Sequence, residues 1–111
     1  MKHSAPLLAI SLTACATTHP ALAVPTRHDV QEYVAANWQY YQNDVRRAAA
    51  GYAGRLELVG VSELKCGGRG MTMCDFQITA KTEAGDLVSV RKSELLGYGD
   101  DGKLGEFIIV G

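Results

Sequence analysis

The sequence predicts an α+β fold in which one or two N-terminal helices pack on a four-stranded antiparallel β-meander. Apolar residues recur at helical spacing before Gly54, and strand-like segments separated by turn residues follow it. A short basic and apolar region precedes both. We therefore divide the chain into residues 1–23, a signal peptide, and residues 24–111, a single small α+β domain.

The first 23 residues have the features of an export signal. Lys2 and His3 form a short basic start, and the apolar run Ala5–Ala16 is too short to span a bilayer. Small residues at the first and third positions of the triplet that ends at Ala23 suit a signal peptidase, with cleavage before Val24. This interpretation predicts a periplasmic or secreted protein.

A lipoprotein signal is the alternative interpretation of the same region. The segment Leu12–Cys15 resembles a bacterial lipobox, in which the cysteine is lipidated and becomes the first mature residue. Cys15 would then anchor the protein to a membrane, and we expect membrane contact only in that case. Either route leaves Cys66 and Cys74 as the remaining cysteine pair.

The first mature segment has the pattern of an amphipathic helix. Thr26 and Asp29 resemble a capping box at its start, with Asp in place of the usual Glu. One stripe of the helix carries the residues that we expect to face the sheet. They are Val30, Tyr33, Val34, Asn37, Trp38, Tyr41 and Val45.

A break is expected near the middle of this helical region. Asp44 would fall within the apolar stripe if the helix continued unbroken, and Asn43 precedes it. These two residues predict a kink there, or a second short helix over about 44–52. Gly51 and Gly54 bracket the predicted end of the helix.

Four strands are expected after Gly54. The apolar positions of the first strand change parity at Gly60, which predicts a bulge or a sharp bend. Turns are predicted at Glu83–Gly85, with a left-handed glycine, and at Gly99–Gly102. The predicted strands cover about 55–66, 72–82, 86–96 and 104–110.

The central prediction is a disulfide across the first hairpin. The segment Gly67–Gly70 can only be a turn, and Cys66 opposite Cys74 matches one apolar face to the other, with Leu64 opposite Phe76. A directly opposed pair has about the Cβ separation that a disulfide needs. The closed ring contributes roughly 2–3 kcal/mol in the chain-entropy model. Two reduced cysteines packed in the core are the alternative.

The next hairpin continues the same two faces. The predicted loop places Val88 opposite Ala80 and Val90 opposite Ile78. The apolar run Phe107–Val110 predicts a strand that is buried on both faces or central in the sheet. The face away from the helices is expected to be wet and to carry Asp75, Gln77, Thr79 and Lys81.

Several chemistries are not predicted. The formal net charge is −1 and the Lys and Arg residues form no basic block, so nucleic acid is not an expected partner. His28 is the one histidine after residue 23, and we expect it to be solvated in the first helical turn. With both later cysteines oxidised, no thiolate nucleophile or zinc site is expected. The sequence therefore predicts no catalytic residue, metal or cofactor, although an enzyme with distant paired carboxylates stays open.

The first functional hypothesis is an exported, non-catalytic protein-interaction domain of the bacterial envelope, of the inhibitor, immunity or assembly-accessory type. A rigid, stapled loop carries Arg69 at its tip, with Met71 and Met73 on the face opposite Cys74. Arg and Met are enriched at interfaces, and a preorganised loop loses less entropy on binding. Another protein is therefore the expected partner. The layout resembles the helix-on-four-strand modules of β-lactamase-inhibitor-like and cystatin-like proteins in architecture alone.

Two further hypotheses come from other features. A small-ligand binder or enzyme would use a pocket between helix and sheet lined by Tyr33, Trp38, Tyr40 and Phe76. We expect these aromatic residues to fill most of that space themselves. A structural envelope lipoprotein would require Cys15 to be the lipidated residue.

Overall fold

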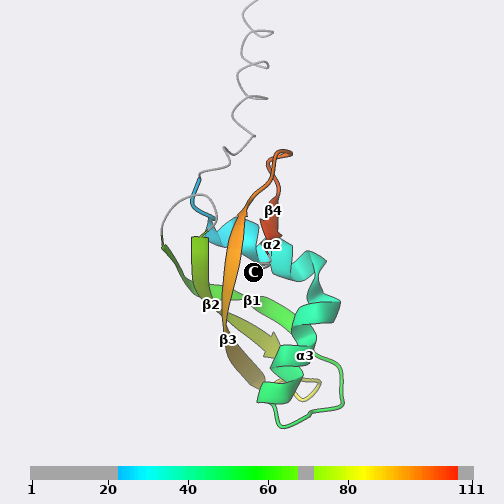
Figure 1. Cartoon of the computed structure of the whole chain (residues 1–111). Helices are drawn as coiled ribbons and strands as arrows, with labels where there is room; N and C mark the ends of the chain where they lie inside the picture. The colour runs from blue at the N-terminus through cyan, green and yellow to red at the C-terminus, as the bar shows by residue number, and fades with distance from the viewer. Residues whose placement is uncertain (1–22, 68–71, 108–111) are drawn as a thin grey trace, which may run out of the picture.

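The computed structural model describes residues 23–67 and 72–107. The predicted α+β fold is confirmed: two helices precede a four-stranded antiparallel sheet with the order β1-β2-β3-β4 (Figure 1). Each strand pairs with its neighbour in the chain, which is the predicted meander. The elements are α2 (Arg27–Ala36), α3 (Trp38–Ala48), β1 (Glu57–Gly67), β2 (Thr72–Lys81), β3 (Leu87–Tyr98) and β4 (Leu104–Glu106).

Helix α2 begins at the predicted cap. The Thr26 Oγ1 atom accepts a hydrogen bond from the Asp29 backbone N–H at 3.2 Å. This side chain satisfies one of the amide groups that a helix start leaves without a partner. His28 is exposed in the first turn, as expected.

The helical region breaks at Asn37, so the prediction of a kink at Asn43 and Asp44 is wrong. The Asn37 side-chain amide donates to the Tyr33 carbonyl oxygen at 2.8 Å, and its backbone N–H also reaches that oxygen. Such local bonding competes with regular helix geometry. Asp44 stays within α3 because Lys92 pairs with its carboxylate at 2.7 Å.

A second helix is present, as the alternative prediction has it, but α3 begins and ends earlier than the predicted range of about 44–52. It ends at Ala48 in a Schellman motif. The Gly51 N–H donates to the Arg46 carbonyl at 2.9 Å, and the Ala50 N–H donates to the Arg47 carbonyl at 3.2 Å. Ala50 has a φ of 56° and Gly51 a φ of 77°. Ala50 therefore occupies a left-handed position that favours glycine.

Two irregularities interrupt the pairing of β1 with β2. The first separates Leu58 from Gly60, where a bulge is predicted. The second lies between Ser62 and Lys65, where the two residues Glu63 and Leu64 face the single residue Phe76, so a bulge replaces the regular Leu64–Phe76 pair that was predicted. Glu63 has a φ of 52°, and this left-handed residue accommodates the extra position in the strand.

The cysteine pair and the second hairpin agree with the predictions. Cys66 lies opposite Cys74 and is bonded to it as a disulfide. In the β2–β3 hairpin, Gly85 has a φ of 91°. The predicted partners of Val88 and Val90 are confirmed as Ala80 and Ile78, respectively.

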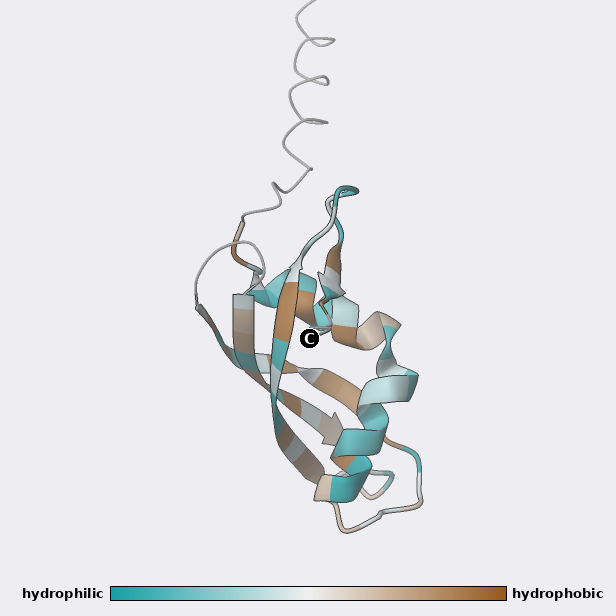
Figure 2. Ribbon diagram, in the orientation of Figure 1, coloured by the Kyte–Doolittle hydropathy of each residue, from teal (hydrophilic) through white to brown (hydrophobic). Residues whose placement is uncertain are grey.

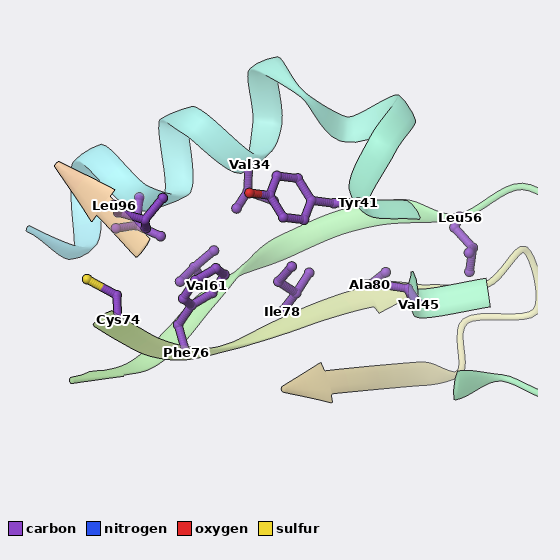
Figure 3. Packing of buried hydrophobic residues seen from close by; sticks show 11 residues of the cluster. Val34, Tyr41, Val45, Leu56, Val61, Cys74, Phe76, Ile78, Ala80 and Leu96 are labelled. Carbon is purple, nitrogen blue, oxygen red and sulfur yellow. The ribbon is translucent and has the colours of Figure 1, made fainter. Parts of the chain in front are cut away.

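Both helices cover one face of the sheet, and the core lies between the two layers (Figure 1). Figure 3 shows Val34 and Tyr41 directed from the helices toward Phe76 and Ile78 of β2. Figure 2 shows hydrophobic segments along the strands, whereas most of α3 is coloured as hydrophilic. The opposite face is exposed or partly exposed at Asp75, Gln77, Thr79 and Lys81, as predicted.

Strand β4 is short and lies at an edge of the described sheet, next to β3. Phe107, just after it, is 38% exposed. The predicted central or doubly buried strand is therefore wrong for β4 and Phe107, because this strand pairs with β3 alone. The rest of the predicted strand, 108–110, lies outside the described residues. The predicted turn before β4 is present, with Gly102 at a φ of 78°.

Candidate functional site

The sheet places two charged residues on its core face. Strand β3 continues the alternation of Val88 and Val90, so Lys92 and Glu94 also point toward the helices. Glu94 is 6% exposed. A buried carboxylate is costly unless it is paired and hydrogen-bonded, so its partners indicate how the fold tolerates it.

The partners of Glu94 come from α3 and β3. The Tyr41 hydroxyl donates to the Glu94 Oε1 atom at 2.5 Å. The Lys92 Nζ atom lies 3.9 Å from Glu94 Oε2 and 2.7 Å from Asp44 Oδ2. Arg47 also pairs with Asp44. The result is a compact network in which Lys92 is shared between two carboxylates.

Burial shifts the titration of this network. Burial raises the pKa of Glu94, although the Tyr41 hydrogen bond acts to lower it. Burial also raises the pKa of Tyr41, and its hydrogen bond to Glu94 raises it further. Burial acts to lower the pKa of Lys92, but the hydrogen bond and charge of Asp44 outweigh it and raise that pKa. The network therefore favours a protonated Tyr41 and a charged Lys92.

A groove of about 570 Å³ lies beside this network. We call it the tyrosine groove, and it is formed where the α2–α3 junction meets β4. The ring planes of Tyr33 and Tyr40 are inclined by 73° and 81° to that of Tyr41, at centroid distances of 6.2 and 5.1 Å. The Tyr41 ring thus contacts both other rings edge to face, and Glu106 contributes a carboxylate to the same groove. The lining residues are Tyr33, Asn37, Tyr40, Tyr41 and Glu106.

The open face of the sheet carries a different feature, an apolar row across β2, β3 and the end of β4. Met73 is 48% exposed and lies opposite Leu95. The Phe107 N–H donates to the Leu95 carbonyl at 2.9 Å, so the antiparallel pairing continues by one residue and places Phe107 opposite Leu95. We call Met73, Leu95 and Phe107 the open-face strip.

The predicted interaction residues are placed only in part. Met73 is exposed on the open face, as expected. Arg69 and Met71 lie outside the described residues, as does the lipidation candidate Cys15. Val24, on the mature side of the predicted cleavage after Ala23, is exposed.

The four predicted pocket residues separate into two pairs. Tyr33 and Tyr40 line the tyrosine groove. Phe76 is fully buried in the core, and Trp38 packs against the core while its Nε1–H donates to the Leu56 carbonyl at 3.2 Å. Phe76 and Trp38 therefore fill space, as expected, whereas Tyr33 and Tyr40 border an open groove.

Lys92, Glu94 and Glu106 were not predicted from the sequence. The signal for Lys92 and Glu94 was present, because the alternation that places Val88 and Val90 on the core face continues to these two residues. Glu106 has no such local signal. It becomes part of a site only because β4 lies against the helices, which is a long-range contact.

Two other kinds of feature are absent from residues 23–67 and 72–107. No group of three or more His, Cys, Asp or Glu side chains is arranged to hold a metal ion in this part of the chain. No helix in the same residues has the length and apolar character needed to cross a membrane.

Comparison with protein-family models, curated proteins and solved structures gives no match.

Proposed function

We propose that the chain is an exported, non-catalytic protein-interaction domain of the bacterial envelope, of the inhibitor, immunity or assembly-accessory class. The observation that carries this proposal is the open-face strip. Its three apolar side chains lie on the face that neither helix covers, and Met73 and Phe107 are exposed there. Exposed apolar groups gathered on one surface are typical of sites that bind another protein.

The surroundings of the strip suit a protein partner. Asp75 lies two residues from Met73 on the same face of β2, and it accepts a hydrogen bond from Ser93, which lies opposite it on β3. An apolar centre with a polar rim is the usual anatomy of an interface. The Cys66–Cys74 disulfide fixes the adjacent hairpin, so the surface loses less conformational entropy when a partner binds.

Export is the second part of the proposal. Disulfides persist in oxidising compartments and are rare in the cytosol. The Cys66–Cys74 bond is compatible with such a compartment, and residues 1–23 have the composition of an export signal. Both features support a periplasmic or secreted protein.

Site-specific photo-cross-linking in the native host tests the interaction. A photoreactive amino acid replaces Met73 in the full chain, and the matched control carries it at Thr79, on the same face of β2 but away from the strip. We expect a discrete adduct with a second protein from position 73, and its loss when Leu95→Asp is added. Equal labelling from both positions, or adducts only between copies of this chain, would contradict the proposal.

A second candidate function is the binding of a small ligand. The tyrosine groove favours it, because its volume of about 570 Å³ lies within the range of roughly 300–1,000 Å³ typical of ligand pockets. Tyr33 and Tyr40 line it, as this hypothesis requires. The groove and the open-face strip lie on opposite faces of the sheet, so the two functions are compatible and separately testable.

A further inference from the structure

We propose that the tyrosine groove binds a small organic cation that carries an ammonium group. This inference rests on the second candidate function and names its class of ligand. Aromatic ring faces attract cations through their quadrupole, and rings grouped around quaternary ammonium ligands are a recurrent arrangement in proteins. The groove combines three tyrosine rings with one carboxylate.

The charges around the groove favour a cation over an anion. Lys92 and Arg47 both pair with Asp44, and Lys92 also approaches Glu94. Within residues 23–67 and 72–107, no Lys or Arg lies within salt-bridge distance of the Glu106 carboxylate. Among these residues, the negative charge of Glu106 on the groove wall therefore has no basic partner.

The titration of Tyr33 agrees with this charge distribution. Burial raises the pKa of the Tyr33 phenol, and the charges of Glu106 and Glu94 raise it further. The same negative field that opposes formation of a phenolate would attract a cation. The arrangement of the rings, and not this titration, defines the site.

The tyrosine cluster already accommodates a cation that belongs to the chain. The Lys92 Nζ atom lies 6.0 Å from the centroid of the Tyr41 ring. Tyr41 is 1% exposed and is fixed by its bond to Glu94, whereas Tyr40 is 56% exposed. Tyr41 thus forms the buried base of the groove, and Tyr33 and Tyr40 provide the ring surface that is open to a ligand.

Two other grooves among the described residues have different linings. The groove beside the β2–β3 hairpin is lined by side chains of both charge signs and contains no aromatic ring. The groove between α2 and β4 is lined by Tyr33 and Tyr98, by the carboxylates of Asp29 and Glu32, and by Lys103. Asp29 already accepts a hydrogen bond from the Tyr98 hydroxyl, and Lys103 adds a positive charge to the lining. Of these three grooves, the tyrosine groove alone combines three tyrosine rings with a carboxylate and has no Lys or Arg in its lining.

Three probes of one shape test the proposal by amide NMR titration of the full chain. The first is choline, and the second is its uncharged isostere, 3,3-dimethylbutan-1-ol, in which carbon replaces the quaternary nitrogen. The third is 3,3-dimethylbutanoate, the carboxylate of that isostere, which is an anion. We expect choline to bind with a dissociation constant on the order of a millimolar. Saturable shifts should appear at Tyr33, Tyr40 and Glu106, and both other probes should bind at least about tenfold more weakly.

Substitutions assign the effect to the groove. We expect Glu106→Gln and Tyr40→Leu each to weaken choline binding by roughly tenfold, and Tyr40→Phe to retain it because the ring remains. Unchanged amide spectra away from the groove verify that each variant is folded. Binding of choline that Glu106→Gln and Tyr40→Leu leave unaltered would overturn the proposal.

The three probes also separate the inference from the function on which it rests. If the uncharged or anionic probe saturates the groove as well as choline does, the groove binds small ligands but the cation assignment is wrong. If no probe gives saturable shifts there, both the cation assignment and the small-ligand function are contradicted.

Discussion

Removal of the Tyr41 hydroxyl is predicted to destabilise the domain strongly. Tyr41 and Glu94 are both buried, and the hydroxyl donates to Glu94 Oε1 at 2.5 Å. Tyr41→Phe keeps the ring in the core but leaves that carboxylate oxygen without its donor. Lys92, at 3.9 Å from the other oxygen, is too distant to replace the hydrogen bond.

The size of the effect follows from the charged acceptor. A hydrogen bond to a charged group contributes about 1.5–3 kcal/mol, and a buried group left unsatisfied costs a similar amount. For a domain of this size, each kcal/mol lowers the melting temperature by roughly 4–8 °C. We therefore expect Tyr41→Phe to reduce the free energy of unfolding by about 2 kcal/mol and the melting temperature by roughly 10 °C.

Urea and thermal unfolding at neutral pH measure the effect, and Tyr40→Phe is the matched control. Tyr40 precedes Tyr41 in α3 but is 56% exposed, so the same chemical change there should cost less than about 0.5 kcal/mol. Equal stability of the two variants would refute the assignment of a stabilising role to the buried hydrogen bond.

Three further predictions concern stability. Because burial raises the pKa of Glu94, the native state holds this proton to higher pH than the unfolded chain does. The wild type therefore loses stability as the pH rises above the ordinary carboxyl value of about 4, and the stability of Glu94→Gln relative to wild type should increase. Urea titrations at several pH values measure this, and a constant difference would contradict it. Replacement of Cys66 and Cys74 by Ala should lower the free energy of unfolding by about 2–3 kcal/mol in oxidising buffer, because the bond closes a sequence separation of 8. Added reductant should destabilise the wild type but have no effect on the variant. Ala50→Gly should stabilise the domain by about 0.5–1 kcal/mol, because Ala50 has a φ of 56°. The control, Ala35→Gly within α2, should destabilise the domain by a similar amount. A loss of stability in both variants would argue against left-handed strain at Ala50.

Local patterns predicted much of the fold. Alternation along β2 and β3, together with the turn at Gly85, was sufficient to fix the register of that hairpin. The Cys66–Cys74 pair followed from the same alternation and from the glycine-rich turn between the cysteines. These features depend on residues that are close in the sequence, where the period of two determines which face each side chain occupies.

The errors arose where a local pattern competes with tertiary contacts. Asp44 and Asn43 predicted a kink or the start of a second short helix, but Lys92 of β3 compensates the charge of Asp44, and the break occurs at Asn37 instead. The bulge at Glu63 requires a left-handed glutamate, which no propensity favours. Whether a strand adopts such a bulge depends on its pairing with the neighbouring strand and not on the local sequence alone.

The candidate sites were less accessible to sequence analysis than the fold. Met73 could be recognised as an exposed residue, but its neighbours Leu95 and Phe107 join it only through pairing of three strands. The tyrosine groove likewise requires α2, α3 and β4 to meet. A surface assembled from separate elements has no signature within one stretch of sequence.

We propose that this domain acts outside the reducing cytoplasm with its disulfide formed. The intact mass of the protein from its native host, measured with and without reductant, is a test of both points. We predict a chain that starts at Val24 and gains two hydrogen atoms on reduction, as the Cys66–Cys74 bond requires. An acylated chain that starts at Cys15 would replace soluble export by the lipoprotein alternative, and an unprocessed chain with a mass insensitive to reductant would contradict export and the disulfide together.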